Sequence, residues 1–260
     1  MQTYLESHTF SHSKQKIKGK LYGIGADIHF DDTEIRFAYE YGRTDTKQPP
    51  LTRDLKVQKF FFLYNHTLNK QFDINLNYLS MLDDNIAITN GGDTFGAGVS
   101  YRPSKQWYTN FTQFYTNYND FNVYQSNLTL NYKIKLGAYK IKLTSENFYI
   151  NIDDKKQNSF TKNAQKEYFS SALKLHTHYN DWHFGAAAFF GRRAFAVMND
   201  GFKLQHHAME FDRTYAAGVG KNIGNAVIRV QFIYQRATEL PLQNKDVEVR
   251  NIRLLLNYKF

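Results

Sequence analysis

The chain of 260 residues contains no cysteine, so it has neither a disulfide framework nor a thiolate metal site. It also lacks any apolar run near the ~18 residues that a membrane-spanning helix needs. This excludes helical membrane proteins but not membrane barrels, whose strands alternate apolar and polar residues. The stretch from Met1 to Glu6 lacks the basic and apolar regions of a signal peptide. An exported protein would therefore have lost that signal, or the chain would be part of a longer one.

The motifs of common catalytic and cofactor sites are missing too. There is no P-loop and no Rossmann fingerprint, and the nine histidines are scattered without the spacing of a known metal motif. We therefore expect no metal and no cofactor. The formal net charge is +9, but the basic residues are spread along the chain, which argues against a nucleic-acid partner.

Aromatic residues are abundant, at 17% of the chain, and many alternate with polar residues. The C-terminal stretch shows this most clearly: Ile252, Leu254, Leu256, Tyr258 and Phe260 fall on one face, and Asn251, Arg253, Asn257 and Lys259 fall on the other. Alternation with a period of two predicts a strand with one apolar face. At a sheet edge in water such a strand would be exposed and sticky, whereas in a closed barrel it pairs with the first strand.

The same alternation recurs along the chain and predicts about fourteen strands. Short turns near Asp31, Leu68, Ser104, Gly137, Asn180 and Gly224 alternate with longer links near Ser13, Pro49, Asn85, Lys156, Asn199 and Leu242, and only the link at Asp120 is short out of turn. This predicts one all-β domain over residues 1–260, an antiparallel up-and-down barrel. Phe148, Ile150 and Ile152 depart from the parity of their strand, which suggests a β-bulge or a strand leaving the barrel wall.

In these features, and in its terminal Phe260, the chain resembles the porins of the Gram-negative outer membrane over nearly its whole length. The resemblance is architectural. It extends to the Opr-like porins, which have more strands and longer chains, so the chain would be a short member or a fragment without N-terminal strands. The resemblance implies a transmembrane β-barrel in the bacterial outer membrane, with short periplasmic turns and longer outer loops. It also implies lipids and lipopolysaccharide as surroundings, small solutes or ions as cargo, and the barrel-assembly machinery as a partner of the C-terminal strand. It does not decide whether the protein forms a homo-oligomer.

Two weaker resemblances concern barrel enzymes. The pairs His206–His207 and Asp83–Asp84, with Asp212, resemble the Asp/His groups of omptin proteases, but their spacing does not match. The Ser-His-Ser run at 11–13 is the nearest arrangement to an outer-membrane phospholipase, and it has no orienting partner. We therefore expect no enzyme.

The polar face of each strand should line a wet lumen, because about fourteen strands enclose more space than side chains can fill. The candidate pore-lining residues are the charged members of that face: Arg36, Lys133, Lys135, Lys140, Lys142, Lys174, Arg229, Arg253, Asp27, Glu34, Glu40, Asp73, Glu146 and Asp212. Their basic members predict a weak anion preference, and the alternative is a charge-balanced wall. Small residues of the same face, such as Gly23 and Gly96, either leave an open bore or receive aromatic side chains from neighbouring strands.

The segment 191–208 is rather apolar for an exposed loop and is the candidate constriction, with Arg192, Arg193 and Phe195 as its residues. The alternative is a disordered or partner-facing outer loop. The favoured function is passive diffusion of small hydrophilic solutes through a water-filled pore. One alternative is a substrate-selective channel constricted by this segment. Another is a non-conducting surface barrel for adhesion or anchoring, which a lumen blocked by Phe61, Leu63 and Phe189 would favour.

Overall fold

The computed structural model describes residues 1–49, 51–83, 89–154, 161 and 163–260, and within these ranges it consists of strands, turns and loops. Asp84 and the predicted links at Asn85 and Lys156 lie outside them. In the described ranges there is no helix with the length and apolar character to cross a membrane. The strands are β1 (Gln2–Ser11), β2 (Lys16–Phe30), β3 (Thr33–Thr46), β4 (Leu55–Thr67), β5 (Phe72–Asp83), β6 (Gly92–Tyr101), β7 (Trp107–Asn117), β8 (Phe121–Leu136), β9 (Tyr139–Asp154), β10 (Glu167–Tyr179), β11 (Trp182–Arg193), β12 (Val197–Met198), β13 (Lys203–Leu204), β14 (Met209–Ile223), β15 (Ala226–Glu239) and β16 (Asn244–Tyr258).

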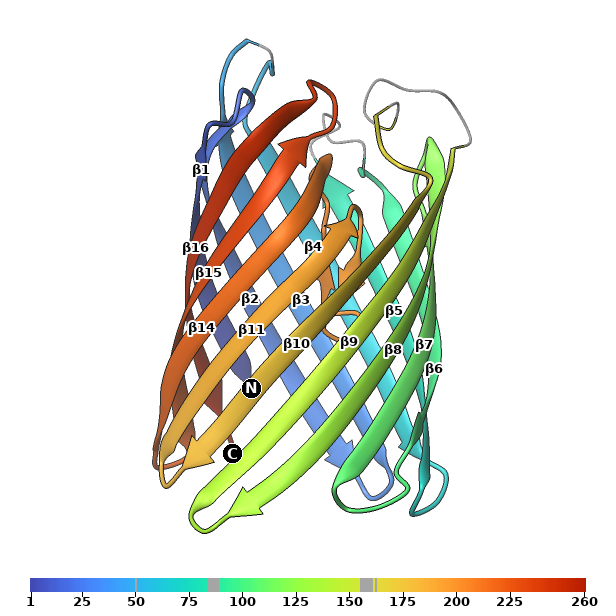
Figure 1. Ribbon diagram of the computed structural model, residues 1–260, viewed down its shortest axis with the longest axis vertical. Coiled ribbons are helices and arrows are strands. Elements are labelled where there is room, and N and C mark those ends of the chain that lie inside the picture. Colours follow the sequence, from blue (N-terminus) through green and yellow to red (C-terminus); the bar gives the residue numbers. More distant parts are fainter. Residues whose placement is uncertain (50, 84–88, 155–160, 162) are drawn as a thin grey trace.

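Fourteen of these strands form one closed barrel in which each strand pairs antiparallel with its two neighbours (Figure 1). The other two, β12 and β13, form a separate two-stranded sheet. β1 pairs with β16 from Gln2↔Asn257 to Ser11↔Glu248, so these two strands close the barrel without any further strand. The predicted all-β, up-and-down barrel of about fourteen strands is confirmed.

Connections differ in length between the two ends of the barrel. At the lower end in Figure 1, turns of two to five residues join successive strands, and both chain termini lie toward this end. The other end carries the longest connections, up to the fifteen residues 194–208, but the predicted longer links at Ser13 and Leu242 are wrong, since each has only four residues. The link at Asp120 is short, as the sequence predicts. Two-residue turns hold neighbouring strands in fixed register, whereas the long connections leave room for elaboration.

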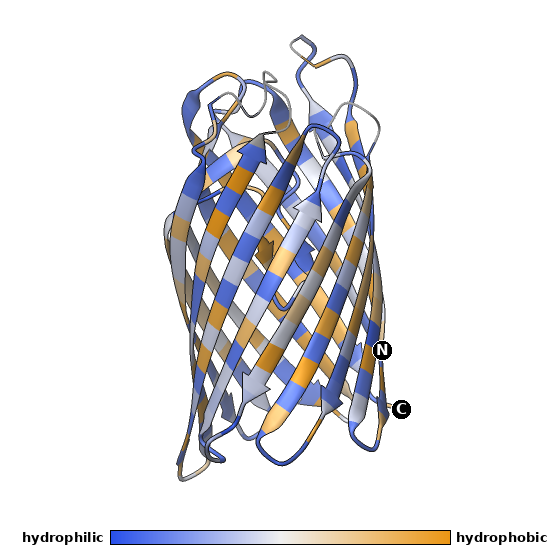
Figure 2. Ribbon diagram, turned by 90° about the vertical axis from the view of Figure 1, so that its right-hand side faces the viewer, coloured by the Kyte–Doolittle hydropathy of each residue, from blue (hydrophilic) through white to orange (hydrophobic). Residues whose placement is uncertain are grey.

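Apolar and polar residues alternate along the strands of the barrel (Figure 2), and many large apolar side chains are exposed on its outer surface. On β16, Ile252 is 60% exposed and Leu254 is 47% exposed, while Asn251, which precedes Ile252, is only 5% exposed. Large apolar side chains face outward along the other strands too, and many inward positions are polar, although the inner faces of β4 and β9 also carry apolar residues. Such an outer surface is unfavourable in water and fits the hydrocarbon core of a bilayer, where closed barrels satisfy every backbone group.

Aromatic rings gather on the outer surface near the short-turn end. They pair across neighbouring strands, with ring centroids 4.9 Å apart for Phe72–Tyr101, 4.6 Å for Trp107–Tyr132 and 4.6 Å for Tyr139–Tyr179. Rings of this kind form the girdle that membrane barrels place at the lipid–water interface, and cross-strand pairing stabilises the sheet beneath them.

Charged and polar side chains inside the barrel join β1 to β16 at the seam where the barrel closes. Glu6 accepts a hydrogen bond of 2.5 Å from Nε of Arg253 and one of 2.7 Å from Nδ2 of Asn251. The Arg253 guanidinium also lies 5.0 Å from the centroid of the Tyr4 ring. The carboxylate is 4% exposed, so its two donors supply the interactions that water would otherwise give it.

Two features of the inner wall decide questions that the sequence leaves open. The register of β9 with both neighbours is continuous, so the predicted bulge or exit at Phe148, Ile150 and Ile152 is wrong; these side chains are buried on the inner face. Gly23 and Gly96 receive aromatic rings, because an added Cβ would lie 2.2 Å from the Tyr4 ring and 2.4 Å from the Phe114 ring. Parts of the wall are therefore apolar and filled rather than open.

Candidate functional site

The segment between β11 and β14 folds into the barrel as a short hairpin, and we call residues 194–208 the lumen hairpin (Figure 1). Its strands are β12 and β13, and Ala194 through Val197 have no exposed surface. The chain turns inward at Gly191, with φ of 83°, where a Cβ would lie 2.4 Å from a backbone oxygen. The tip consists of Asn199, Asp200 and Gly201, all with positive φ, which these residue types tolerate best.

One side of the lumen hairpin packs against an apolar wall. The Phe195 ring lies 4.9 Å from the Phe121 ring and 6.0 Å from the Tyr118 ring, all three being fully buried. Ile150 and Phe148 of β9 belong to the same cluster. Close packing of this kind leaves no space for water, so the hairpin fills the lumen beside the outer halves of β8 and β9.

Gln125 of β8 fixes the hairpin backbone at one residue. Its Nε2 donates to the carbonyl oxygen of Val197 at 2.6 Å, and its Oε1 accepts from the Val197 N–H at 2.8 Å. Asn127 adds a longer bond of 3.4 Å to the same carbonyl. The side-chain amide thus replaces a strand partner, because a buried backbone group without one would be costly.

The three predicted constriction residues lie in different places. Arg193 is fully buried where the hairpin begins, donates to Oγ1 of Thr214, and stacks 4.8 Å from the Phe189 ring. Phe195 lies in the sealing cluster described above. Arg192 is 58% exposed and pairs at 3.4 Å with Glu210 at the outer end of β14. Arg193 and Phe195 therefore fasten the hairpin, while Arg192 lies apart from it.

The other side of the lumen hairpin faces β1–β3 and β16 across two cavities. A cavity of about 300 Å³ lies toward the short-turn end, beside the tip, and includes Asp27 and Arg36 in its lining. A second, of about 80 Å³, lies toward the hairpin base and includes His206 and His207. Glu40, Lys203 and Arg253 line both cavities, so these three charged residues lie where the two cavities adjoin. We call this junction the eyelet.

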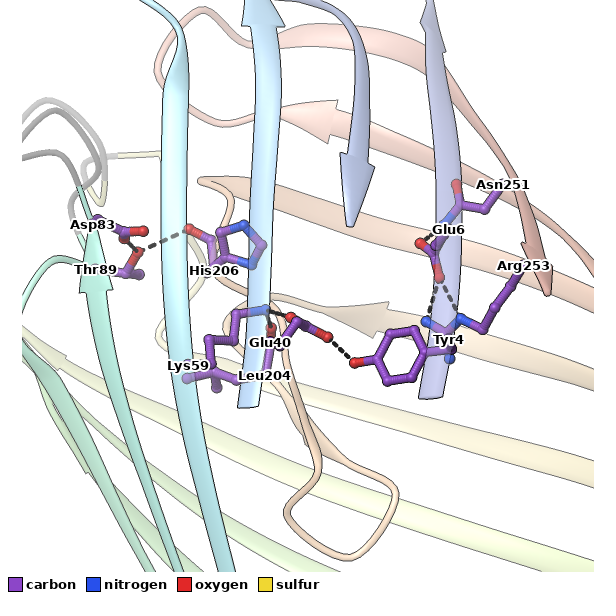
Figure 3. A network of polar contacts seen from close by, with 10 residues as sticks. All are labelled: Tyr4, Glu6, Glu40, Lys59, Asp83, Thr89, Leu204, His206, Asn251 and Arg253. Atoms are coloured by element: carbon purple, nitrogen blue, oxygen red, sulfur yellow. Dashed lines mark hydrogen bonds and ion pairs between the residues drawn. The ribbon is translucent and has the colours of Figure 1, made fainter. Parts of the chain in front are cut away.

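Charges around the eyelet are arranged in pairs (Figure 3). Lys59 and Glu40 form an ion pair of 2.6 Å with both side chains buried, and Tyr4 donates its hydroxyl hydrogen to the same carboxylate. Glu6 and Arg253 form the second pair, at the seam. Within the described ranges no carboxylate pairs with Lys203, so this ammonium leaves the eyelet with an excess positive charge.

Two further links tie the lumen hairpin to the wall near the eyelet. Nζ of Lys59 donates to the carbonyl oxygen of Leu204 at 3.5 Å, and Oγ1 of Thr89 donates to that of His206 at 3.0 Å.

Solved structures resemble the fold of this chain. No protein-family model matches the sequence, and no curated protein matches it. A bacterial polysaccharide outer membrane secretin superposes with a TM-score of 0.60 at 9% identity, over 100% of this chain and 98% of that chain. The NanC porin superposes with a TM-score of 0.52 at 9% identity, over 99% of this chain and 100% of that chain. The outer membrane protein Omp33 of Acinetobacter baumannii superposes with a TM-score of 0.52 at 9% identity, over 100% of this chain and 98% of that chain. The chain has the fold of an outer-membrane β-barrel.

The predicted pore-lining residues of this outer-membrane barrel fall into four groups. Arg36 pairs with Glu34 at 2.6 Å and with Asp27 at 3.5 Å at the large cavity, and Lys174 pairs with Glu146 at 2.5 Å on β10 and β9. Arg253 and Glu40 lie at the eyelet.

Lys133 and Lys135 stand opposite Lys142 and Lys140 across β8 and β9, and Arg229 stands opposite Gly220. Asp73 pairs with Arg102 of a short turn, and Asp212 pairs with Arg236 at the bulge in β14, away from the eyelet.

Sequence reasoning missed several residues that shape this site. Lys59 lies between inward Val57 and Phe61, and a single charge on an otherwise apolar face is a signal that could have marked it. Gln125 carries no comparable signal, because its partner Val197 is 72 residues away. His176, His178 and His183, treated as scattered in the sequence, come together at the short-turn end of the lumen.

Proposed function

We propose that this protein is a channel of the porin class in the bacterial outer membrane, which admits small hydrophilic solutes or ions through a restricted passage. One observation carries the proposal: the lumen hairpin seals one side of the barrel and leaves two charged cavities that meet at the eyelet on the other. Polar, charged cavities in series are what a hydrated solute needs, whereas a dry core would exclude the charges. The solved structures of similar fold, among them a porin and a secretin, support transport rather than catalysis.

We base a weak anion preference on the charges at the eyelet itself. There Glu40 and Glu6 are neutralised by Lys59 and Arg253, which leaves Lys203 as the excess charge, whereas the larger cavity adds Asp27 and Asp200 against Arg36. Farther toward the periplasmic end, the four lysines of β8 and β9 place a basic strip on the wall. Fixed positive charge in a narrow, poorly screened passage raises the local concentration of anions.

The second candidate is a non-conducting surface barrel used for adhesion or anchoring. The apolar cluster around Phe195 favours it, because Phe61, Phe189 and their neighbours fill the lumen on the sealed side. In that case the two cavities would be enclosed hydration sites rather than a path.

The test is conductance of the refolded barrel in a planar bilayer, with the reversal potential measured in a KCl gradient. We expect small, steady steps and a reversal potential that indicates anion preference. Lys203→Met keeps the side-chain volume and removes the charge, so the reversal potential should move toward cations. Lys70→Met is the matched control, because Lys70 is exposed on a short turn. Absence of conductance from a demonstrably folded barrel would refute the channel and support the surface barrel.

Membrane partners belong to the same proposal. Phe260 and the apolar face of β16 form the signal that the barrel-assembly machinery reads, and lipids and lipopolysaccharide surround the outer surface. Hydrogen-bonded polar pairs on that surface, Gln113–Ser126 at 2.6 Å and Asn147–Ser171 at 2.8 Å, are unusual against lipid and suit contact with a second copy. Light scattering that finds only single barrels in detergent would argue against the homo-oligomer.

A further inference from the structure

Three histidines meet on the inner wall near the periplasmic end, on the opposite face of β10 and β11 from the lipid. His176 and His178 are two residues apart on β10, so both point inward, and His183 of β11 stands directly opposite His178 in the register. One ligand nitrogen from each of the three lies within 4.8 Å of the others. Nε2 of His176 is 2.8 Å from Nε2 of His178, and the His178 and His183 ring centroids are 4.1 Å apart.

The His183 ring is held in one tautomer by a neighbour. Its Nε2 bonds to Oδ1 of Asn222 at 2.6 Å, and since an amide oxygen only accepts, Nε2 carries the hydrogen. The other nitrogen, Nδ1, therefore presents a lone pair. Within the described ranges Nδ1 is buried without a hydrogen-bond partner, and the residue is 5% exposed. A buried acceptor with no donor is costly unless something electrophilic occupies its lone pair.

We propose that His176, His178 and His183 bind a divalent transition-metal ion of the Zn²⁺ type. Neutral imidazoles are the preferred ligands of such ions, and a three-histidine set leaves the fourth position open. Zn–N bonds of about 2.0–2.1 Å set tetrahedral ligand nitrogens roughly 3.3 Å apart, which the three rings reach by shifts of about an ångström. Gly185, opposite His176, leaves space for such a shift, because an added Cβ there would meet nothing closer than 3.9 Å. The Asn222 contact is the kind of outer support that orients a ligating histidine.

The surroundings limit how tightly the ion binds. Lys142 and Lys140 of β9 stand opposite His176 and His178, and the Arg229 side chain covers Gly220, which stands opposite His183. Three fixed positive charges near a dication weaken its binding. We therefore expect a reversible site, weaker than the closed zinc sites that hold small domains together.

Titration of tag-free, refolded barrel with Zn²⁺ by calorimetry tests the proposal, with Co²⁺ absorption as a second readout of three-nitrogen coordination. We expect one Zn²⁺ per chain. His178→Gln and His183→Gln should each weaken binding at least tenfold, and Asn222→Ala should weaken it by roughly 10- to 100-fold although no ligand is removed. His29→Gln is the matched control, because His29 is exposed at the same end of the barrel on β2.

Folding of each variant is checked by the shift in gel migration on boiling, so that loss of binding is not confused with loss of the barrel. If His183→Gln fails to fold, His176→Gln replaces it. Wild-type barrel that binds no Zn²⁺, or binding that survives in the His178→Gln variant, would overturn the site. Neither result depends on whether the barrel conducts.

Discussion

Replacing Gln125 by alanine should release the lumen hairpin from the sealed wall. The variant removes both hydrogen bonds to Val197, and Asn127 can keep only the carbonyl, so the buried Val197 N–H is left without a partner. An unsatisfied buried donor costs about 1–3 kcal/mol. Because this penalty applies only while the hairpin is docked, the ratio of undocked to docked hairpin should rise roughly 5- to 150-fold.

Single-channel recording in a planar bilayer measures that ratio directly, as the fraction of time spent in states of higher conductance. Gln58→Ala is the matched control, because Gln58 is an exposed amide on β4 whose partner is the Tyr39 hydroxyl. We expect brief, large openings to be frequent in Gln125→Ala and rare in the wild type and the control. Identical traces for all three proteins would refute the idea that the docked hairpin limits passage.

Three further variants test the rest of the structure. Glu40→Ala leaves the buried Lys59 ammonium unpaired and should lower the free energy of unfolding in urea by about 3–5 kcal/mol, so an unchanged urea midpoint would contradict the buried ion pair. Leu173→Arg places a charge on the outer surface, where Leu173 is 59% exposed, and should cost about 2–4 kcal/mol in lipid vesicles if that position lies near the bilayer centre; no cost would count against the assigned lipid face. Phe260→Ala should reduce the yield of barrel assembled in cells but change the stability of the refolded barrel by less than about 0.5 kcal/mol, since Phe260 is 90% exposed; equal yields would argue against its role as a signal.

Alternation and loop length suffice to predict the barrel from the sequence. Each strand must present one face to lipid and one to the lumen, so the pattern at Ile252 and Leu254 is dictated by the surroundings and repeats locally. The short turns follow from residues such as Gly137, which supplies a positive φ of 58° between β8 and β9. None of this requires knowledge of distant contacts.

The contacts around the eyelet could not be predicted in the same way. Glu40 and Arg253 were predicted to line the lumen, but period-two reasoning does not say what an inward side chain such as Lys59 or Gln125 meets there. The error at Phe148 and Ile150 is instructive in this respect. A strand that is apolar on both faces was interpreted as a bulge, whereas the second apolar face packs against the lumen hairpin. The apolar inner faces of β4 and β9 were therefore the sequence signal that another segment packs inside the barrel.

The seam between β1 and β16 has a consequence for how the chain is made. Its fastening joins Glu6 to Asn251 and Arg253, residues separated by 245 and 247 positions. Contacts of such long range form late, because the entropy cost of closing so long a loop must be met before the contacts can stabilise the chain. Until β16 pairs with it, the β1 edge is exposed and open to other chains. Closure of the seam is therefore the step that removes the last free strand edge of the barrel.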